Sequence, residues 1–209
     1  MHRINASLIF VAFAVIALSS CHSTGSPGDD MGTSTTPPPL TPPAGFAHVV
    51  VLRNSDKGYN VNFAILDQDV QYHGDAVAGY YFITPVKPGR HMFVSWAENT
   101  DAVQIDAEEG KTYFVRCRAT WGAWSSGADL LAIKPGTEAW HDLPGWLARA
   151  EYMTVDRETA HASLMERKPD ATVNRVERGK KWWEEMSDEK RVRRTLIGAD
   201  GVTRWPSAD

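Results

Sequence analysis

Cysteine is scarce in this sequence, with only Cys21 and Cys117 among 209 residues. Two cysteines can form at most one disulfide, which such a pair ordinarily does in a protein outside the cytoplasm. A basic excess is missing too, since 22 Lys and Arg stand against 26 Asp and Glu. Binding to nucleic acid needs clustered positive charge, so the composition predicts no nucleic-acid partner.

The sequence lacks the motifs that mark common hydrolases. It contains neither the Gly-x-Ser-x-Gly turn that exposes a serine nucleophile nor the His-Glu-x-x-His pattern of zinc proteases. We therefore expect no enzymatic activity and no cofactor.

Metal ligands at a recognisable spacing are missing as well. Glu138 with His141, and Glu158 with His161, have the i, i+3 spacing of di-iron ligands, but such a site also needs two further glutamates and four long helices. The other histidines that could ligate a metal match no known spacing: His48, His73 and His91. We therefore expect no metal site.

The first twenty residues have the features of a signal peptide. A positive charge at Arg3 is followed by an unbroken apolar run from Leu8 to Leu18, which is too short for a helix that must cross ~30 Å of hydrocarbon but suits a signal-peptide core. A plain secretory signal or a retained transmembrane anchor are the alternatives.

The run ends in Leu-Ser-Ser-Cys at 18–21, which resembles the bacterial lipobox. The resemblance implies cleavage between Ser20 and Cys21, a diacylglyceryl group on the Cys21 thiol, and acylation of the new amino terminus. Several acyl chains hold a protein on a membrane durably, at ~0.8 kcal/mol for each buried methylene. The resemblance also implies a cell-envelope protein that faces the periplasm, and His22, in place of aspartate, favours the outer membrane.

Residues 21–45 follow as a lipidated cysteine and a tether rich in Pro, Ser and Thr. A segment with so few core-forming side chains cannot bury enough apolar area to offset the entropy of ordering it. We expect a spacer between the membrane and a folded domain.

The folded domain is expected over residues 46–135, where short β-type runs alternate with turn residues. Lys87-Pro88-Gly89 separates two of these runs and indicates a hairpin. Runs at this spacing predict a mainly β fold, an antiparallel β-sandwich of about seven strands. The candidate strands are 46–53, 59–66, 79–86, 90–98, 102–108, 112–121 and 130–133.

Three features of this domain resemble a family of bacterial lipoproteins built on a single β-sandwich domain of unknown function. They are the first strand ending in Arg53, the VKPGRH turn at 86–91, and AEEGKTYFVRCR at 107–118. The hairpin pattern is also loosely similar to PEGA-type domains. The family has no established activity, so the resemblance implies a fold and no catalytic residues.

Residues 136–209 are expected to form a connector and a charged helical tail. Asp156 is placed to cap a helix that ends before Pro169, and a second helix with an apolar stripe follows from Asp170. Gly179 lies inside that second helix, at a cost of ~1 kcal/mol relative to alanine. The pattern leaves open whether the tail packs on the β-domain.

Four tryptophans gather near the end of the β-domain: Trp121, Trp124, Trp140 and Trp146. Exposed rings could stack on sugars of peptidoglycan or anchor an envelope protein, whereas buried rings would fill the sandwich or dock the tail. Cys117 has no partner once Cys21 is acylated, so we expect a half-buried thiol in the core. The sequence thus predicts a lipid-anchored envelope protein with a structural or binding role, and a peptidoglycan-binding module as the alternative.

Overall fold

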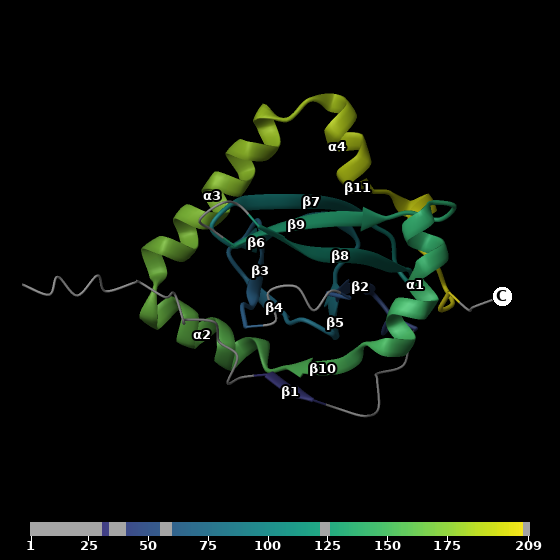
Figure 1. Ribbon diagram of the computed structural model, residues 1–209, viewed down its shortest axis with the longest axis horizontal. Coiled ribbons are helices and arrows are strands. Elements are labelled where there is room, and N and C mark those ends of the chain that lie inside the picture. The colour runs from purple at the N-terminus through teal and green to yellow at the C-terminus, as the bar shows by residue number, and fades with distance from the viewer. Residues whose placement is uncertain (1–30, 34–40, 55–59, 122–125, 207–209) are drawn as a thin grey trace, which may run out of the picture.

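The computed structural model describes residues 31–33, 41–54, 60–121 and 126–206 (Figure 1). Three residues of the predicted sites lie outside these ranges: Ser20, Cys21 and Trp124. No helix in the described ranges is long and apolar enough to span a membrane.

The described strands form two mixed sheets. The first sheet runs in the order β1 (Met31–Thr33), β10 (Glu151–Val155), β5 (Tyr80–Val86), β2 (Ala47–Leu52), β8 (Thr112–Trp121) and β9 (Ser126–Ile133). The second runs in the order β11 (Thr195–Leu196), β7 (Thr100–Ala107), β6 (Gly89–Trp96), β3 (Phe63–Asp67) and β4 (Tyr72–Ala76).

The main core lies between the two sheets, where apolar side chains from both form one cluster. Val49 and Val115 enter it from the first sheet, and Ile65 and Ile105 from the second. Cys117 is fully buried in the same cluster and is a free thiol. The location in the core agrees with the expectation, but the thiol is fully buried where half burial was expected.

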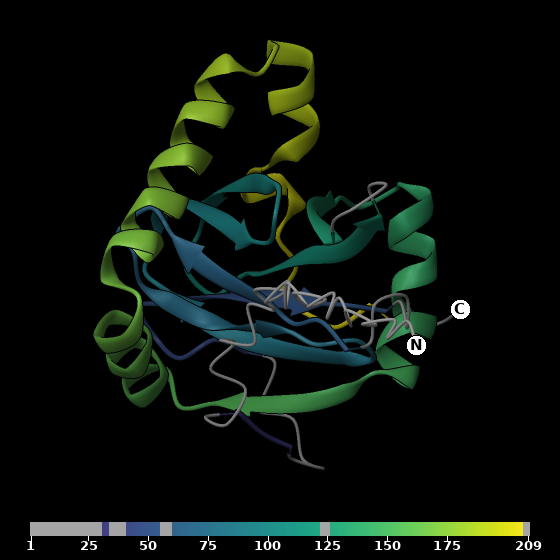
Figure 2. The same cartoon turned by 60° about the vertical axis from the view of Figure 1, so that its left-hand side comes forward.

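Helices cover the outer face of each sheet (Figure 2). On the first sheet, α1 (Glu138–Arg149) inserts Leu143 among Val50 and Phe114. On the second, α2 (Arg157–Arg167) and α3 (Pro169–Glu185) pack Leu164 and Val176 against β3 and β4. The chain is thus a helix–sheet–sheet–helix arrangement, with α4 (Asp188–Arg194) beyond it.

This layering explains why β2 is entirely apolar from Val49 to Leu52. Ala47, Val49 and Val51 face the core between the sheets, whereas Val50 and Leu52 lie beneath α1. A strand covered on both faces favours apolar side chains on both of them.

The mainly β fold with a C-terminal helical extension is confirmed, but the fully antiparallel sandwich of seven strands is wrong. Three strand pairs are parallel: β2 with β8, β10 with β5, and β11 with β7. The extra strands were not predicted because β4 is polar, with the sequence YHGDA, and because β10 and β11 are short pieces between helices. The tail also packs on the domain, since β10 and β11 complete the two sheets.

The hairpin predicted around Pro88 is wrong as well. Gly89 has a φ of +128° and the chain does turn there, but β5 belongs to the first sheet and β6 to the second. Proline and glycine fix a local turn. They do not decide whether the next strand pairs with the previous one or crosses the core to the opposite sheet.

Candidate functional site: a cationic groove along helix α3

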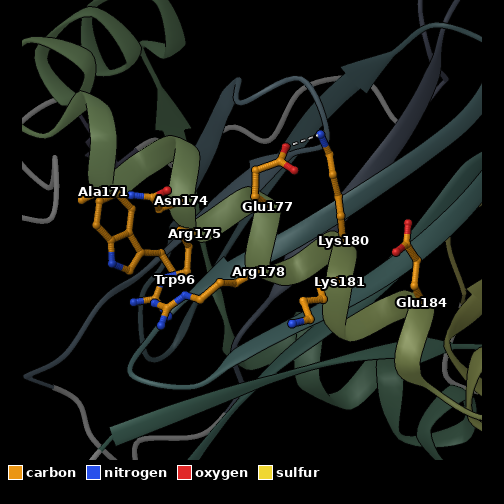
Figure 3. Close-up of a pocket in the computed structure, with 9 residues that line it drawn as sticks. All are labelled: Trp96, Ala171, Asn174, Arg175, Glu177, Arg178, Lys180, Lys181 and Glu184. Atoms are coloured by element: carbon orange, nitrogen blue, oxygen red, sulfur yellow. Dashed lines mark hydrogen bonds and ion pairs between the residues drawn. The ribbon is translucent and has the colours of Figure 1, made fainter.

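A groove of about 810 Å³ runs along the outer face of α3 (Figure 3). The opposite face of this helix buries Thr172, Val176, Gly179 and Trp183 against the second sheet, at helical spacing. The polar positions between them therefore face outward and line the groove together with Trp96, the last residue of β6. The lining is Trp96, Ala171, Asn174, Arg175, Glu177, Arg178, Lys180, Lys181 and Glu184.

Arg175 is the half-buried cation of this groove. Its Nη1 atom donates to the carbonyl of Asn99 at 3.1 Å and to Oγ1 of Thr100 at 3.1 Å, which fixes the guanidinium against the β6–β7 turn. These acceptors are neutral, and Nε has no hydrogen-bond partner among the described residues. Burial, and then the positive charge of Arg178, lower the pKa of Arg175 to about 10.

Arg178 lies beside Arg175 and is exposed. Within the described ranges, no hydrogen bond or ion pair involves its side chain. The two nearby lysines differ in this respect: Lys180 pairs with Glu177 at 2.8 Å, and Lys181 approaches Glu185 at 3.8 Å. The uncompensated positive charge of the groove is therefore concentrated on the arginine pair.

Trp96 forms the end of the groove next to these arginines. The guanidinium carbon of Arg175 and the Nζ atom of Lys168 each lie 5.9 Å from the centre of its indole ring. Cations are attracted to the face of an indole ring at this range. The ring thus helps to hold positive charge at this end, away from Glu184 at the other end (Figure 3).

A second polar cluster lies inside the protein. Nη1 of Arg157 donates to Oγ1 of Thr84 at 3.0 Å, and this oxygen lies 2.8 Å from Nδ1 of His73. Nε2 of His73 lies 3.0 Å from Oδ2 of Asp67. Arginine can only donate hydrogen bonds, so the Thr84 oxygen accepts from Arg157 and its own hydroxyl proton can be donated to Nδ1 of His73. The proton on Nε2 of His73 is then donated to Oδ2 of Asp67.

This cluster has the order hydroxyl, imidazole and carboxylate that nucleophilic enzymes use. Thr84, however, has no exposed surface, so a substrate cannot reach its hydroxyl. Burial alone would raise the pKa of Asp67, but the hydrogen bonds that its carboxylate accepts from His73 and from the N–H groups of Gln71 and Asp69 hold that pKa below its ordinary value. The cluster joins β3, β4, β5 and the start of α2, and its role is structural.

The structure accounts for the predicted tryptophan site only in part. Trp140 and Trp146 are half-buried where α1 meets the first sheet. Trp140 packs edge-on against Phe114, and the Arg116 guanidinium lies 4.4 Å from the centre of the Trp146 ring. Trp121 ends β8, while Trp124 lies outside the described residues. Packing explains two of the rings, and the peptidoglycan-binding alternative stays a prediction.

The histidines considered as metal ligands have other surroundings. His73 belongs to the buried cluster, His91 lies 2.7 Å from the carbonyl of Lys87, and His48 is buried on β2. Across the residues that the structure describes, no three His, Cys, Asp or Glu side chains lie close enough to hold a metal ion.

The groove was missed at the level of sequence because its residues look like a solvated helix face. RVERGKK at 175–181 alternates charges in a manner typical of exposed helices. One signal was available: two arginines three residues apart, which share a helix face. That Trp96 joins them depends on the packing of α3 across β6.

Comparisons with known proteins return no relative: no family model matches the chain, and no curated protein or solved structure matches it.

Proposed function

We propose that this protein is a lipid-anchored protein of the bacterial cell envelope that binds a partner or ligand through its folded domain. The observation that carries the proposal is the order of features at the amino terminus. A charged start, a short apolar run and Leu-Ser-Ser-Cys are followed by a tether and then by the domain. This order is typical of a chain that is exported, cleaved before Cys21 and held by acyl groups.

The arrangement of β1 supports a close approach to the membrane. Met31 to Thr33 pair with Val155 to Met153 of β10, at the edge of the first sheet. Nine residues lie between Cys21 and Met31, and an extended chain over these ten Cα–Cα steps spans at most about 35 Å. Anchoring at Cys21 would therefore hold the β1–β10 edge within that distance of the lipid surface.

A binding role agrees better than catalysis with the chemistry described above. The buried Asp67–His73–Thr84 cluster is closed to substrates, whereas the α3 groove is open and carries uncompensated charge.

Fractionation of cells that express Cys21→Ala tests the anchor. We expect the parent protein in the membrane fraction and labelled by an alkyne analogue of palmitate, and the variant unlabelled. The matched control is Cys117→Ala, which removes the other cysteine and should remain labelled and membrane-bound. A Cys21→Ala variant that is labelled and sediments like the parent would refute the anchor.

A further inference from the structure

We propose that the α3 groove binds a phosphate monoester, held by the guanidinium groups of Arg175 and Arg178. The proposal goes beyond membrane anchoring, because it concerns a ligand site on the folded domain. It requires neither acylation nor a particular membrane.

The first argument is charge. Two guanidinium groups lie side by side on one face of α3 without an acidic partner in the described part of the chain, while the neighbouring lysines each have a glutamate. Two like charges held close together repel each other and raise the free energy of the protein. An anion bound between them would offset this repulsion. The burial of Arg175 increases this effect, because solvent screens its charge less.

The second argument is geometry. Arg175 is fixed by its bonds to the β6–β7 turn and by the Trp96 ring. One arm of the site is therefore pre-organised, which lowers the entropy lost on binding. Arg178 makes no such bonds and is free to close on a ligand. Figure 3 shows both side chains on the same side of α3, with Lys181, whereas Glu177 and Lys180 pair on the other.

The third argument concerns the type of anion. A carboxylate is satisfied by one guanidinium fork, but a phosphate monoester carries close to two negative charges and three terminal oxygens. Two adjacent arginines match that charge and number of acceptors. The amide of Asn174, which also lines the groove, can supply a further donor.

The phosphate could belong to a soluble ester or to a lipid headgroup, and the experiment separates the two. The mature chain from Cys21 onward is kept in neutral dodecyl maltoside micelles. Binding of glycerol 1-phosphate is measured by calorimetry, with glycerol as the blank. In the second arm the micelles contain radiolabelled phosphatidic acid or phosphatidylcholine, and the lipid recovered with the protein is counted.

We expect one site per chain for at least one of the two phosphate monoesters, with little recovery of phosphatidylcholine. Arg178→Gln should weaken binding by about 10-fold or more, the usual loss for a charged hydrogen bond. Because Arg178 is exposed and makes no internal bond, this variant should unfold like the parent. Arg175→Gln should also weaken binding, but it removes contacts to the β6–β7 turn, so Arg178→Gln is the decisive variant.

Arg90→Gln is the matched control, since it removes one exposed arginine that pairs with Asp106 on β7. It should bind like the parent. Binding of the soluble ester would show that the phosphate group suffices, and recovery of phosphatidic acid alone would identify a headgroup site. The proposal is overturned if neither probe binds, or if Arg178→Gln binds as tightly as the parent. Neither result would contradict the proposed anchor at Cys21, which is tested separately.

Discussion

Arg194 and Asp101, which are 93 residues apart in the chain, form an ion pair of 2.6 Å inside the protein. Asp101 also accepts the N–H groups of Ala102 at 2.8 Å and Leu130 at 2.9 Å, and Arg194 donates to the Leu130 carbonyl at 2.6 Å. The Arg194 guanidinium lies 5.1 Å from the centre of the Trp182 ring. This pair connects the end of α4 to β7 and β9.

Replacing Arg194 by methionine should destabilise the protein by about 3 kcal/mol or more. The change leaves Asp101 in the interior, with 2% of its side chain exposed, without a counterion. Urea denaturation followed by circular dichroism measures the loss. The control is Arg118→Met, whose partner Asp129 and own side chain are 22% and 48% exposed, and which should cost at most about 1 kcal/mol. Equal losses in the two variants would contradict the prediction.

Asp101 should also make stability depend on pH. Burial raises its pKa from 3.8 to about 6, against the opposing effects of Arg194 and of two backbone N–H groups. The folded protein therefore holds a proton between pH 4 and pH 6 that the unfolded chain has released. Binding of this proton stabilises the fold, and its contribution to the free energy of unfolding is complete below about pH 3.8. The contribution is lost as the pH rises through 6, at up to ~1.4 kcal/mol per pH unit.

The lowered pKa of Asp67 has the opposite effect on stability. Ionised Asp67 stabilises the fold above about pH 3.8, and this contribution is lost as the pH falls below that value. Between pH 4 and pH 6 the Asp101 effect should dominate the difference between the parent and Asp101→Asn. The free energy of unfolding of both is measured from pH 4 to pH 7. Parallel curves over that range would show that Asp101 does not titrate as described.

Thr84→Val should destabilise the fold by about 1–3 kcal/mol. Valine has nearly the same shape as threonine, but it leaves Nδ1 of His73 and Nη1 of Arg157 without the hydroxyl that connects them. Thermal unfolding measures the cost. Thr203→Val makes the same chemical change at an exposed position and should have little effect. A Thr84→Val variant as stable as Thr203→Val would mean that the cluster contributes nothing.

The sequence predicted those features that depend on local patterns. Phe63 and Ile65 alternate into the core as expected, Tyr113 and Val115 are buried, and Asp156 caps α2 by accepting the N–H of Thr159. Gly110, like Gly89, has a positive φ. Each of these follows from side-chain periodicity or from the conformational range of one residue.

What could not be predicted depends on contacts between distant segments. Arg53 was expected only to end a strand, yet it is fully buried and donates to the Ala76 carbonyl at 3.1 Å. Nothing near Asp101 in the chain indicates that Arg194 is its partner, or that Trp96 reaches the arginines of α3. Such pairs are set by which helix covers which sheet, and the periodicity of a single segment carries no information about that.

Gly179 shows how tertiary packing can reverse a local rule. In an isolated helix alanine is more stable than glycine by ~1 kcal/mol, but a Cβ atom at position 179 would lie 2.7 Å from both methyl groups of Val94. Gly179→Ala should therefore destabilise the protein, by about 1–3 kcal/mol. Combining it with Val94→Ala should cost less than the sum of the two single changes.

Gly145 in α1 is the control for this prediction, because a Cβ atom there meets nothing nearer than Nη1 of Arg149 at 3.5 Å. Gly145→Ala should leave stability unchanged or raise it by up to ~1 kcal/mol. If Gly179→Ala also stabilises the protein, α3 does not lie as close to β6 as described.

Counting reactive thiols tests the two cysteines together. Burial raises the pKa of Cys117 to about 12, and only an accessible thiolate reacts readily, so the native mature protein should not react with a thiol reagent such as dithionitrobenzoate. In guanidinium chloride the same protein should show one thiol, because a thioether at Cys21 cannot react. Cys117→Ala should then show none. Two thiols in the denatured parent would mean that Cys21 is not acylated, and a rapidly reacting thiol in the native parent would mean that Cys117 is not in the core.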